Sequence, residues 1–188
     1  MYGYKALVWD PTSGSAISPI GFTVWQTART RAICSFSDYN EGGPSTSHPA
    51  PDEQCSCGIY AAGMFLWLMD YVGGIRTSLQ MQRAFTALLV AGGKVIELNM
   101  GWRAAEAEIL AVSVAPTIMD KLSPRAAIEA AEAFGIPFEP SPLSLGGIAI
   151  EHQTAQLDGA SRHPEDATPA PRMPWSRMGQ PLSSKRRV

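Results

Sequence analysis

The amino-acid sequence predicts an α+β domain, in which a mostly antiparallel sheet packs against two helices, with a long metal-pinned loop and a disordered C-terminal tail. Runs of β-branched and aromatic residues alternate with turn residues, which is typical of short antiparallel strands. Two further segments carry helix patterns, and the C-terminal segment is rich in proline. We therefore expect one domain over residues 1–152 and a flexible, Pro-rich, basic tail over residues 153–188.

The first third of the chain is expected to form three strands. Residues 3–9 suit a first strand, and turn residues follow it. Residues 21–26 and 30–36 are rich in Val, Ile, Thr and aromatic side chains, which favours two more strands. The polar stretch 37–57 then predicts a long loop. A loop of this length in a small domain is either functional or held in place by something other than a core.

The apolar run after this loop is expected to form the first helix. Gly58 to Val72 is apolar on nearly all sides, and Gly73-Gly74 would end the helix. Such a composition predicts a central buried helix, with a partner-binding helix as the alternative.

The middle of the chain is expected to form a hairpin. Gly92-Gly93 interrupts a strand-like run and predicts a bend or tight turn. Residues 94–98 and 102–114 then form two strands joined by a glycine-containing loop. The stretch 104–111 is rich in Ala and Glu and could be helical, but the β-branched residues after it favour a strand.

A second helix is expected after Ser123-Pro124. Serine is a good N-cap, and proline is favoured at the first helical position. The apolar face of this helix is formed by Ile128, Ala131 and Phe134. Gly135 stands where a helix commonly ends in a left-handed residue.

Composition and charge restrict the classes of partner. Hydrophobic residues make up 45% of the chain and charged residues 17%, which is enough apolar material for a core. Residues 1–152 carry 9 Lys/Arg against 14 Asp/Glu, whereas residues 153–188 carry 6 against 3. The domain thus gives no strong nucleic-acid signal, while the basic tail could contact acidic partners. In the tail, Arg172 and Trp175 lie in a Pro-rich stretch and indicate a short protein-binding motif.

The chain is expected to be cytoplasmic and not attached to a membrane. Its first residues show no signal-peptide pattern, and the apolar run Ile59 to Val72 is shorter than the roughly 20 residues that a membrane helix needs. In a reducing compartment, the three cysteines are expected to be thiols or metal ligands. The sequence leaves the oligomeric state open.

Four potential metal ligands lie in or beside the long loop: Cys34, His48, Cys55 and Cys57. Thiolate sulfur and imidazole nitrogen are donors that Zn²⁺ prefers, and four of them complete a tetrahedral site. Metal binding would also offset the entropy of ordering the loop. The Cys-x-Cys pair is closer than the usual zinc-finger spacing, yet four ligand-type residues in one region predict a structural zinc site.

Two other interpretations of the cysteines stay open. Cys34 could be a buried strand residue, with Cys55 and Cys57 as ordinary thiols at the end of the loop. Alternatively, Cys57 would directly precede a helix, whose N-terminus lowers a thiol pKa and offers N–H groups to an oxyanion. A cysteine-dependent hydrolase or transferase would then use Cys57 as its nucleophile and His48 or His152 as its base.

A second candidate polar site consists of Arg103, Glu106 and Glu108. If their segment is a strand, Glu106 and Glu108 share a face, and paired carboxylates can transfer protons. The more ordinary interpretation is a solvated strand face with pairing between Arg103 and the glutamates.

Two motifs carry a resemblance to a known group of proteins. The first is His48-Pro49-Ala50-Pro51 followed by Cys55-Ser56-Cys57-Gly58-Ile59-Tyr60-Ala61, and the second is Gly101-Trp102-Arg103-Ala104. Together with Cys34, they resemble a pattern of uncharacterised small proteins of actinobacteria and their phages, over roughly residues 3–138. The resemblance implies no activity, since none is assigned to that family. It implies that the three cysteines and His48 act as a set.

These features predict a non-enzymatic, cytoplasmic protein-binding module with a structural zinc site, of regulatory, phage or mobile-element kind. The alternative is a small cysteine-dependent hydrolase or transferase that uses Cys57. The two differ in one respect that can be measured. A zinc site needs Cys34 and Cys57 equally for folding, whereas an enzyme would keep its fold and lose its activity on Cys57→Ala.

Overall fold

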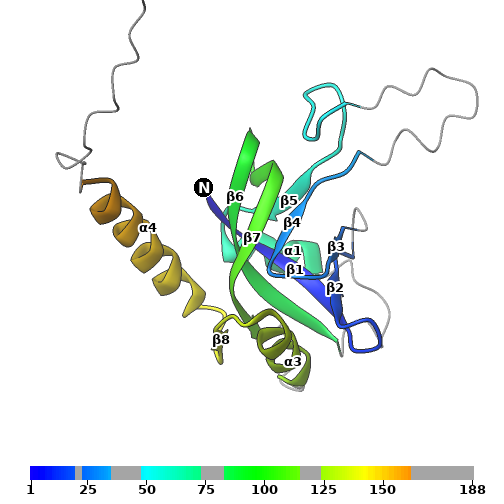
Figure 1. The fold of residues 1–188 in the computed structure, drawn as a ribbon, viewed down its shortest axis with the longest axis vertical. Helices are drawn as coiled ribbons and strands as arrows, with labels where there is room; N and C mark the ends of the chain where they lie inside the picture. Colours follow the sequence, from blue (N-terminus) through cyan, green and yellow to red (C-terminus); the bar gives the residue numbers. More distant parts are fainter. Residues whose placement is uncertain (20–22, 35–47, 73–82, 115–123, 162–188) are drawn as a thin grey trace, which may run out of the picture.

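The computed structural model describes residues 1–19, 23–34, 48–72, 83–114 and 124–161. Within these ranges, eight strands pack against three helices (Figure 1). The expected α+β class and mostly antiparallel sheet are confirmed, with one helix more than the two expected. The strands are β1 (Tyr2–Asp10), β2 (Ser15–Ile17), β3 (Val24–Trp25), β4 (Arg29–Arg31), β5 (Ile59–Ala62), β6 (Ala84–Leu98), β7 (Gly101–Val114) and β8 (Phe138–Glu139). The helices are α1 (Phe65–Val72), α3 (Arg125–Phe134) and α4 (Leu145–Ser161).

The hairpin of β6 and β7 forms the centre of the sheet. The two strands pair antiparallel from Leu98↔Gly101 to Phe85↔Val114, so the expected hairpin is confirmed and 104–111 is a strand. The other edge of β7 pairs in turn with β5, β4 and β8, of which β8 runs parallel to it. Because both edges of β7 are used, this strand determines where the shorter strands lie.

The long strand β6 also connects the hairpin to the start of the chain. It pairs with β1 from Tyr2↔Val90 to Val8↔Ala84, and β1 meets β5 at Tyr4↔Ala62. The strands β1, β6, β7 and β5 therefore form a closed circuit of pairings. Of the bend or tight turn expected at Gly92-Gly93, the tight turn is wrong, because β6 continues through it. The register shift against β7 at this place is that of a β-bulge, which bends a strand.

The first third of the chain confirms one expected strand and shortens two others. Residues 3–9 lie in β1, whereas the strands expected over 21–26 and 30–36 are reduced to β3 and β4. Of these two ranges, residues 21, 22, 35 and 36 lie outside the described residues. Strands β2 and β8 were not expected, since strands of two or three residues are too short to show a periodic pattern.

The helix expected from Gly58 to Val72 is only half right. Residues Ile59–Ala62 form β5, which pairs with Ala104 to Gly101 of β7, and α1 begins at Phe65. In the described side chains of α1, Leu68 is buried and Leu66 is exposed, so α1 is not a central buried helix. Backbone pairing with an available strand edge has prevailed over the helical pattern of the apolar run.

Helix α3 confirms the second expected helix and covers the main core. It runs from Arg125, with Pro124 at its N-cap position, to a left-handed Gly135 at φ 66°. Its buried residues are the four alanines Ala126, Ala127, Ala130 and Ala131, which let the backbone lie close to the sheet. The main core of large side chains includes Leu7, Trp9, Trp25, Ile59, Phe85, Leu89, Trp102, Ile109 and Val112. Ile128, expected on the buried face, is 37% exposed.

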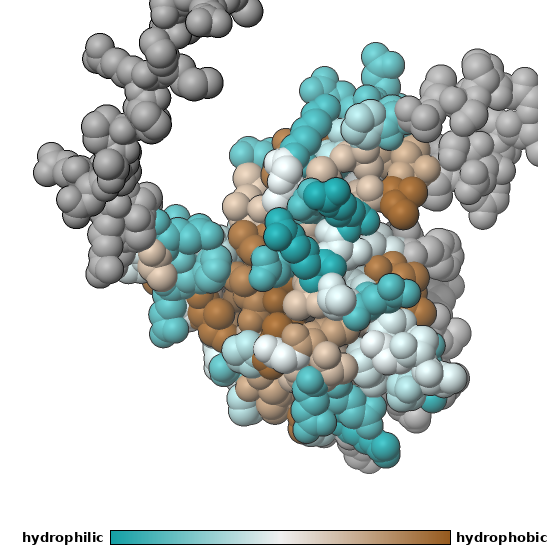
Figure 2. All heavy atoms as spheres, viewed as in Figure 1, coloured by the Kyte–Doolittle hydropathy of each residue, from teal (hydrophilic) through white to brown (hydrophobic). Residues whose placement is uncertain are grey.

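Helix α4 covers the opposite side of the hairpin. Leu145 is fully buried with Leu88 and Ala111, and Ile148 packs beside them. Figure 2 shows hydrophobic residues gathered where α4 meets the hairpin. The helix was not expected, and it runs through the boundary placed between residues 152 and 153. Residues 153–161 are therefore helical rather than part of a flexible tail.

Some expectations fall on residues outside the described ranges. They include Ser123, the loop segment 35–47, and the tail residues Arg172 and Trp175. Among the helices of the described residues, none has the length and apolar character needed to cross a bilayer.

Gly101, the first residue of β7, lies where β5 approaches most closely. A Cβ atom there would lie 2.9 Å from Cα of Ala62 and closer still to the carbonyl oxygen of Ala61. We expect Gly101→Ala to lower the free energy of unfolding by about 2 kcal/mol or more, because backbone has to move. Chemical denaturation measures this. Gly147→Ala in α4 is the control, since nothing lies within 4 Å of its Cβ position and alanine favours a helix. Equal effects of the two substitutions would contradict the close approach.

Candidate metal centre

The loop that carries the cysteines leaves and re-enters the sheet at one point on the edge of β7. Strand β4 ends with Arg31 opposite Glu106, and β5 begins with Ile59 opposite Ala104. Between them, the N–H of Ala32 donates to the carbonyl of Ala105 at 2.7 Å. Both strands run antiparallel to β7, so β4 and β5 lie end to end along its edge. The two ends of the segment between β4 and β5, at residues 32 and 58, therefore lie close together.

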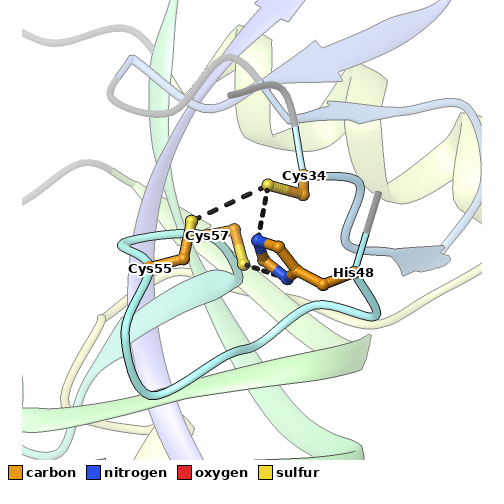
Figure 3. Close-up of side chains that lie close together, drawn as sticks. All are labelled: Cys34, His48, Cys55 and Cys57. Atoms are coloured by element: carbon orange, nitrogen blue, oxygen red, sulfur yellow. Dashed lines mark hydrogen bonds between the residues drawn. The ribbon is translucent and has the colours of Figure 1, made fainter. Parts of the chain in front are cut away.

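The meeting of the loop ends brings the four expected ligand residues together (Figure 3). Their ligand atoms all lie within 4.8 Å of one another. Cys34 Sγ lies 3.2 Å from His48 Nε2 and 3.7 Å from Cys55 Sγ, and Cys57 Sγ lies 3.9 Å from His48 Nδ1. All three cysteines are free thiols. This set of three sulfurs and one imidazole can hold a metal ion.

The imidazole of His48 has a second partner in the loop. Its Nδ1 lies 3.3 Å from the carbonyl oxygen of Pro49. In the tautomer protonated at Nδ1, this N–H donates to Pro49 and leaves the Nε2 lone pair free for a metal ion. The same backbone hydrogen bond raises the pKa of His48.

Local turns hold Cys55 and Cys57 in place. The carboxylate of Asp52 accepts a hydrogen bond from the N–H of Gln54 at 2.9 Å, and its carbonyl accepts one from Cys55 at 3.2 Å. Gly58 then turns the chain into β5 with φ 128°, a value that side chains rarely allow. A Cβ at Gly58 would lie 3.1 Å from the buried Pro51, so a larger residue would disturb the turn that carries Cys57.

Arg103 of β7 connects the sheet to this turn. Its Nη1 donates to the carbonyl oxygen of Cys55 and, at 3.2 Å, to that of Cys57. The residue is only 8% exposed, so the expected solvated pairing of Arg103 with Glu106 and Glu108 is wrong. This role of Arg103 was not expected from the sequence. The available signal was the position of Arg103 between Trp102 and Ala104 in a strand that the core buries.

Glu106 instead pairs with two arginines of β4. Its carboxylate lies 3.2 Å from Nη2 of Arg29 and 2.9 Å from Nε of Arg31. The arginine side chains are 67% and 80% exposed, and exposed pairs of this kind contribute about 0–1 kcal/mol each. The expected solvated strand face with Arg–Glu pairing is thus found at Glu106, but its partners are Arg29 and Arg31 and not Arg103.

The two neighbouring thiols differ in their surroundings. Without a metal ion, burial raises the pKa of Cys57 to about 11. The pKa of Cys55 is lowered, chiefly by a hydrogen bond from the backbone N–H of Cys57. Cys55 is therefore the more readily ionised thiol in the free site.

The geometry removes two of the arguments for treating Cys57 as a nucleophile, although the other candidate base, His48, does lie beside it, with Nδ1 3.9 Å from Cys57 Sγ. Cys57 precedes strand β5, so the helix N-terminus that was expected to lower its pKa does not lie there. The candidate base His152 lies on α4, where Nδ1 is 2.9 Å from the hydroxyl of Tyr2. It is not a member of the cluster around Cys57. Cys34 is partly exposed, which also contradicts its interpretation as a buried strand residue.

Arg103 offers a test of how the sheet supports the loop. Arg103→Met leaves two loop carbonyls without their donor, and we expect a loss of about 1–3 kcal/mol in the free energy of unfolding. We also expect faster loss of bound metal to a chelator, because the turn of Cys55 and Cys57 loosens. Denaturation and chelator competition measure the two effects. Arg31→Gln is the control, since its exposed ion pair should contribute less than about 1 kcal/mol. If both variants behaved alike, Arg103 would have no special role.

The chain matches no protein-family model, and no curated protein or solved structure is significantly similar to it. The resemblance of its His-Pro-Ala-Pro and Cys-Ser-Cys-Gly-Ile-Tyr-Ala motifs to small actinobacterial and phage proteins therefore stays a prediction. What the chain does has to be inferred from the four clustered side chains and their neighbours.

Proposed function

We propose that the chain is a non-enzymatic protein-binding module in which a structural Zn²⁺ ion closes the loop between β4 and β5. The observation that supports this proposal is the convergence of Cys34, His48, Cys55 and Cys57 to within 4.8 Å. These residues come from two ends and the interior of one loop, so one ion would tie three chain positions together.

The donor set and its spacing favour zinc over other metals. Three thiols and an imidazole are soft or borderline ligands, which Zn²⁺ prefers in tetrahedral structural sites. With Zn–S of ~2.3 Å and Zn–N of ~2.0 Å, tetrahedral geometry separates two sulfurs by about 3.8 Å and sulfur from nitrogen by about 3.5 Å. The contacts of Cys34 with Cys55 and His48, at 3.7 and 3.2 Å, are near these values.

The charge around the site also suits a zinc ion. Three thiolates and one Zn²⁺ leave a net charge of about −1 on the centre. The buried guanidinium of Arg103 lies on the backbone carbonyls of two of the three ligating cysteines. A nearby cation of this kind offsets the excess negative charge where water has limited access.

A structural role follows from the number of protein ligands. Catalytic zinc sites commonly keep one position for water or substrate, whereas four protein ligands close the coordination sphere. Here the ion would join Cys34, close to the end of β4, to Cys55 and Cys57, close to the start of β5. Because such a site is absent from the unfolded chain, metal binding would contribute directly to folding.

One exposed apolar residue beside the centre is the candidate for a protein contact. Ile33, next to Cys34, is 85% exposed. Single exposed apolar side chains are common on protein surfaces, so Ile33 enters the proposal as the contact residue to be tested. The tail residues Arg172 and Trp175 stay a predicted second contact. The proposal places the protein in the cytoplasm, since reduced thiols are stable there.

The first test is the metal content of the full chain purified without added metal or chelator. We expect about one zinc per chain, and we expect Cys34→Ser and Cys57→Ser to lower metal content and unfolding temperature alike. Ser56→Ala is the control, because it changes a neighbour but no ligand. Thiols should resist alkylation until a chelator is added, and Cys55 should then react before Cys57, since its pKa is lowered and that of Cys57 is raised. A metal-free protein with one unusually reactive Cys57 would refute the zinc proposal.

The second test addresses the protein contact. Tagged wild-type protein and Ile33→Asp are compared as baits by quantitative mass spectrometry, with metal content checked in both. We expect Ile33→Asp to lose a partner that the wild type retains, because a carboxylate cannot be buried at an apolar contact. Val24→Asp is the control, since Val24 is also exposed but lies on β3. Identical partner sets for all three proteins would contradict a contact through Ile33.

A further inference from the structure

A cavity of about 400 Å³ lies beside the metal centre but shares no residue with it. Strands β1 and β5, helix α1 and the tip of the β6–β7 hairpin line it. Its lining consists of Tyr4, Lys5, Tyr60, Ala61, Ala62, Trp67, Leu68, Leu98, Met100 and Gly101. Its volume is within the range of roughly 300–1,000 Å³ that small-molecule sites occupy.

Lys5 is the one charged residue among those that line the cavity. It is 4% exposed, although it lies in a strand between Tyr4 and Ala6. Its ammonium has three N–H donors, and one of them donates to the carbonyl oxygen of Tyr60 at 2.9 Å. The ion pairs found within the described ranges do not include Lys5. A buried ammonium with a single neutral acceptor is costly, unless an anion completes its surroundings.

The rest of the lining is mostly apolar, apart from the hydroxyls of Tyr4 and Tyr60, and part of it is exposed. Leu98 and Met100, at the end of the hairpin, are 43% and 51% exposed, and Tyr60 is 38% exposed. Trp67 and Leu68 of α1 provide a further apolar wall. An apolar pocket with one convergent charged group is typical of a site that orients a small ligand by a single polar end.

We propose that this cavity binds a small apolar monocarboxylate, whose carboxylate contacts the Lys5 ammonium and whose apolar body packs against Trp67, Leu68 and Met100. Two N–H groups of the ammonium do not donate to Tyr60, and a carboxylate would accept them in charge-assisted hydrogen bonds. Burial lowers the pKa of Lys5 to about 8, so the ammonium is still protonated near neutral pH, and a bound carboxylate would keep it so. This inference does not rest on the zinc proposal, because no metal ligand lines the cavity.

Calorimetric titration of the full chain near neutral pH tests this inference. Octanoate is compared with octan-1-ol, which has the same number of carbon atoms and no charge, and naphthoate replaces the flexible chain by a planar ring. We expect octanoate or naphthoate to bind at least about tenfold more tightly than octan-1-ol, the difference expected of one charge-assisted hydrogen bond. The better of the two acids then identifies the shape of the apolar body.

Lys5→Met tests the role of the ammonium, because methionine keeps most of the apolar stem. We expect octanoate binding to weaken at least about tenfold and octan-1-ol binding to stay unchanged. Lys94→Met is the control, since Lys94 is exposed and does not line the cavity. Metal content is measured in each variant, so a failure of the zinc site is seen separately.

Met100→Asp is a second test of the cavity, which is needed if Lys5→Met does not fold. Met100→Asp places a carboxylate on the exposed part of the lining, and we expect it to weaken octanoate far more than octan-1-ol through charge repulsion. The proposal is overturned if neither acid binds the wild type. It is also overturned if octan-1-ol binds as tightly as octanoate. The proposal is likewise overturned if a folded Lys5→Met variant binds octanoate as tightly as the wild type does. The same conclusion follows if Met100→Asp binds octanoate as tightly as the wild type.

Discussion

The backbone pairing along one edge of β7 is the constraint on which the rest of the structure depends. That edge receives β5, β4 and β8 one after another, while β6 occupies the other edge. Since β4 and β5 meet end to end near Ala105, the loop between them has to leave and return at the same place. The closeness of the four ligand-type side chains is a consequence of this pairing, and the metal proposal adds the ion to a geometry that the sheet has already produced.

Arg103 shows how a sheet residue supports an irregular loop. The loop residues 48–58 form no strand or helix, so their carbonyl groups need partners from elsewhere. A guanidinium presented by the rigid β7 provides donors to two of these carbonyls at once. The same side chain brings a positive charge to a cluster whose thiols become negative when they bind a metal. Hydrogen bonding and charge balance are thus provided by one buried residue.

Tyr60 lies between the metal centre and the apolar cavity. Its carbonyl oxygen accepts a hydrogen bond from Lys5, and its hydroxyl donates to the carbonyl of Ser56 at 2.6 Å, between the two neighbouring cysteines. The short strand β5 therefore forms a wall of the cavity and the exit of the loop at the same time. Strand β5 pairs with β7 at only four positions. A shift of β5 along β7 would therefore change both the wall of the cavity and the end of the loop that carries the cysteines.

The sequence by itself determined the elements whose pattern is local. The hairpin over 94–114 and the helix ending at Gly135 follow from alternation, spacing and turn residues that lie within each segment. The grouping of Cys34, His48, Cys55 and Cys57 was also visible, because all four lie in or beside one loop. Other features depend on partners that are distant in the chain, and only the tertiary structure decided them. Ile59–Ala62 is a strand because it pairs with an edge of β7, although the apolar pattern of these residues predicts a helix. Likewise, the burial of Arg103 and Lys5 follows from acceptors 46 to 55 residues away, and no local pattern contains that information.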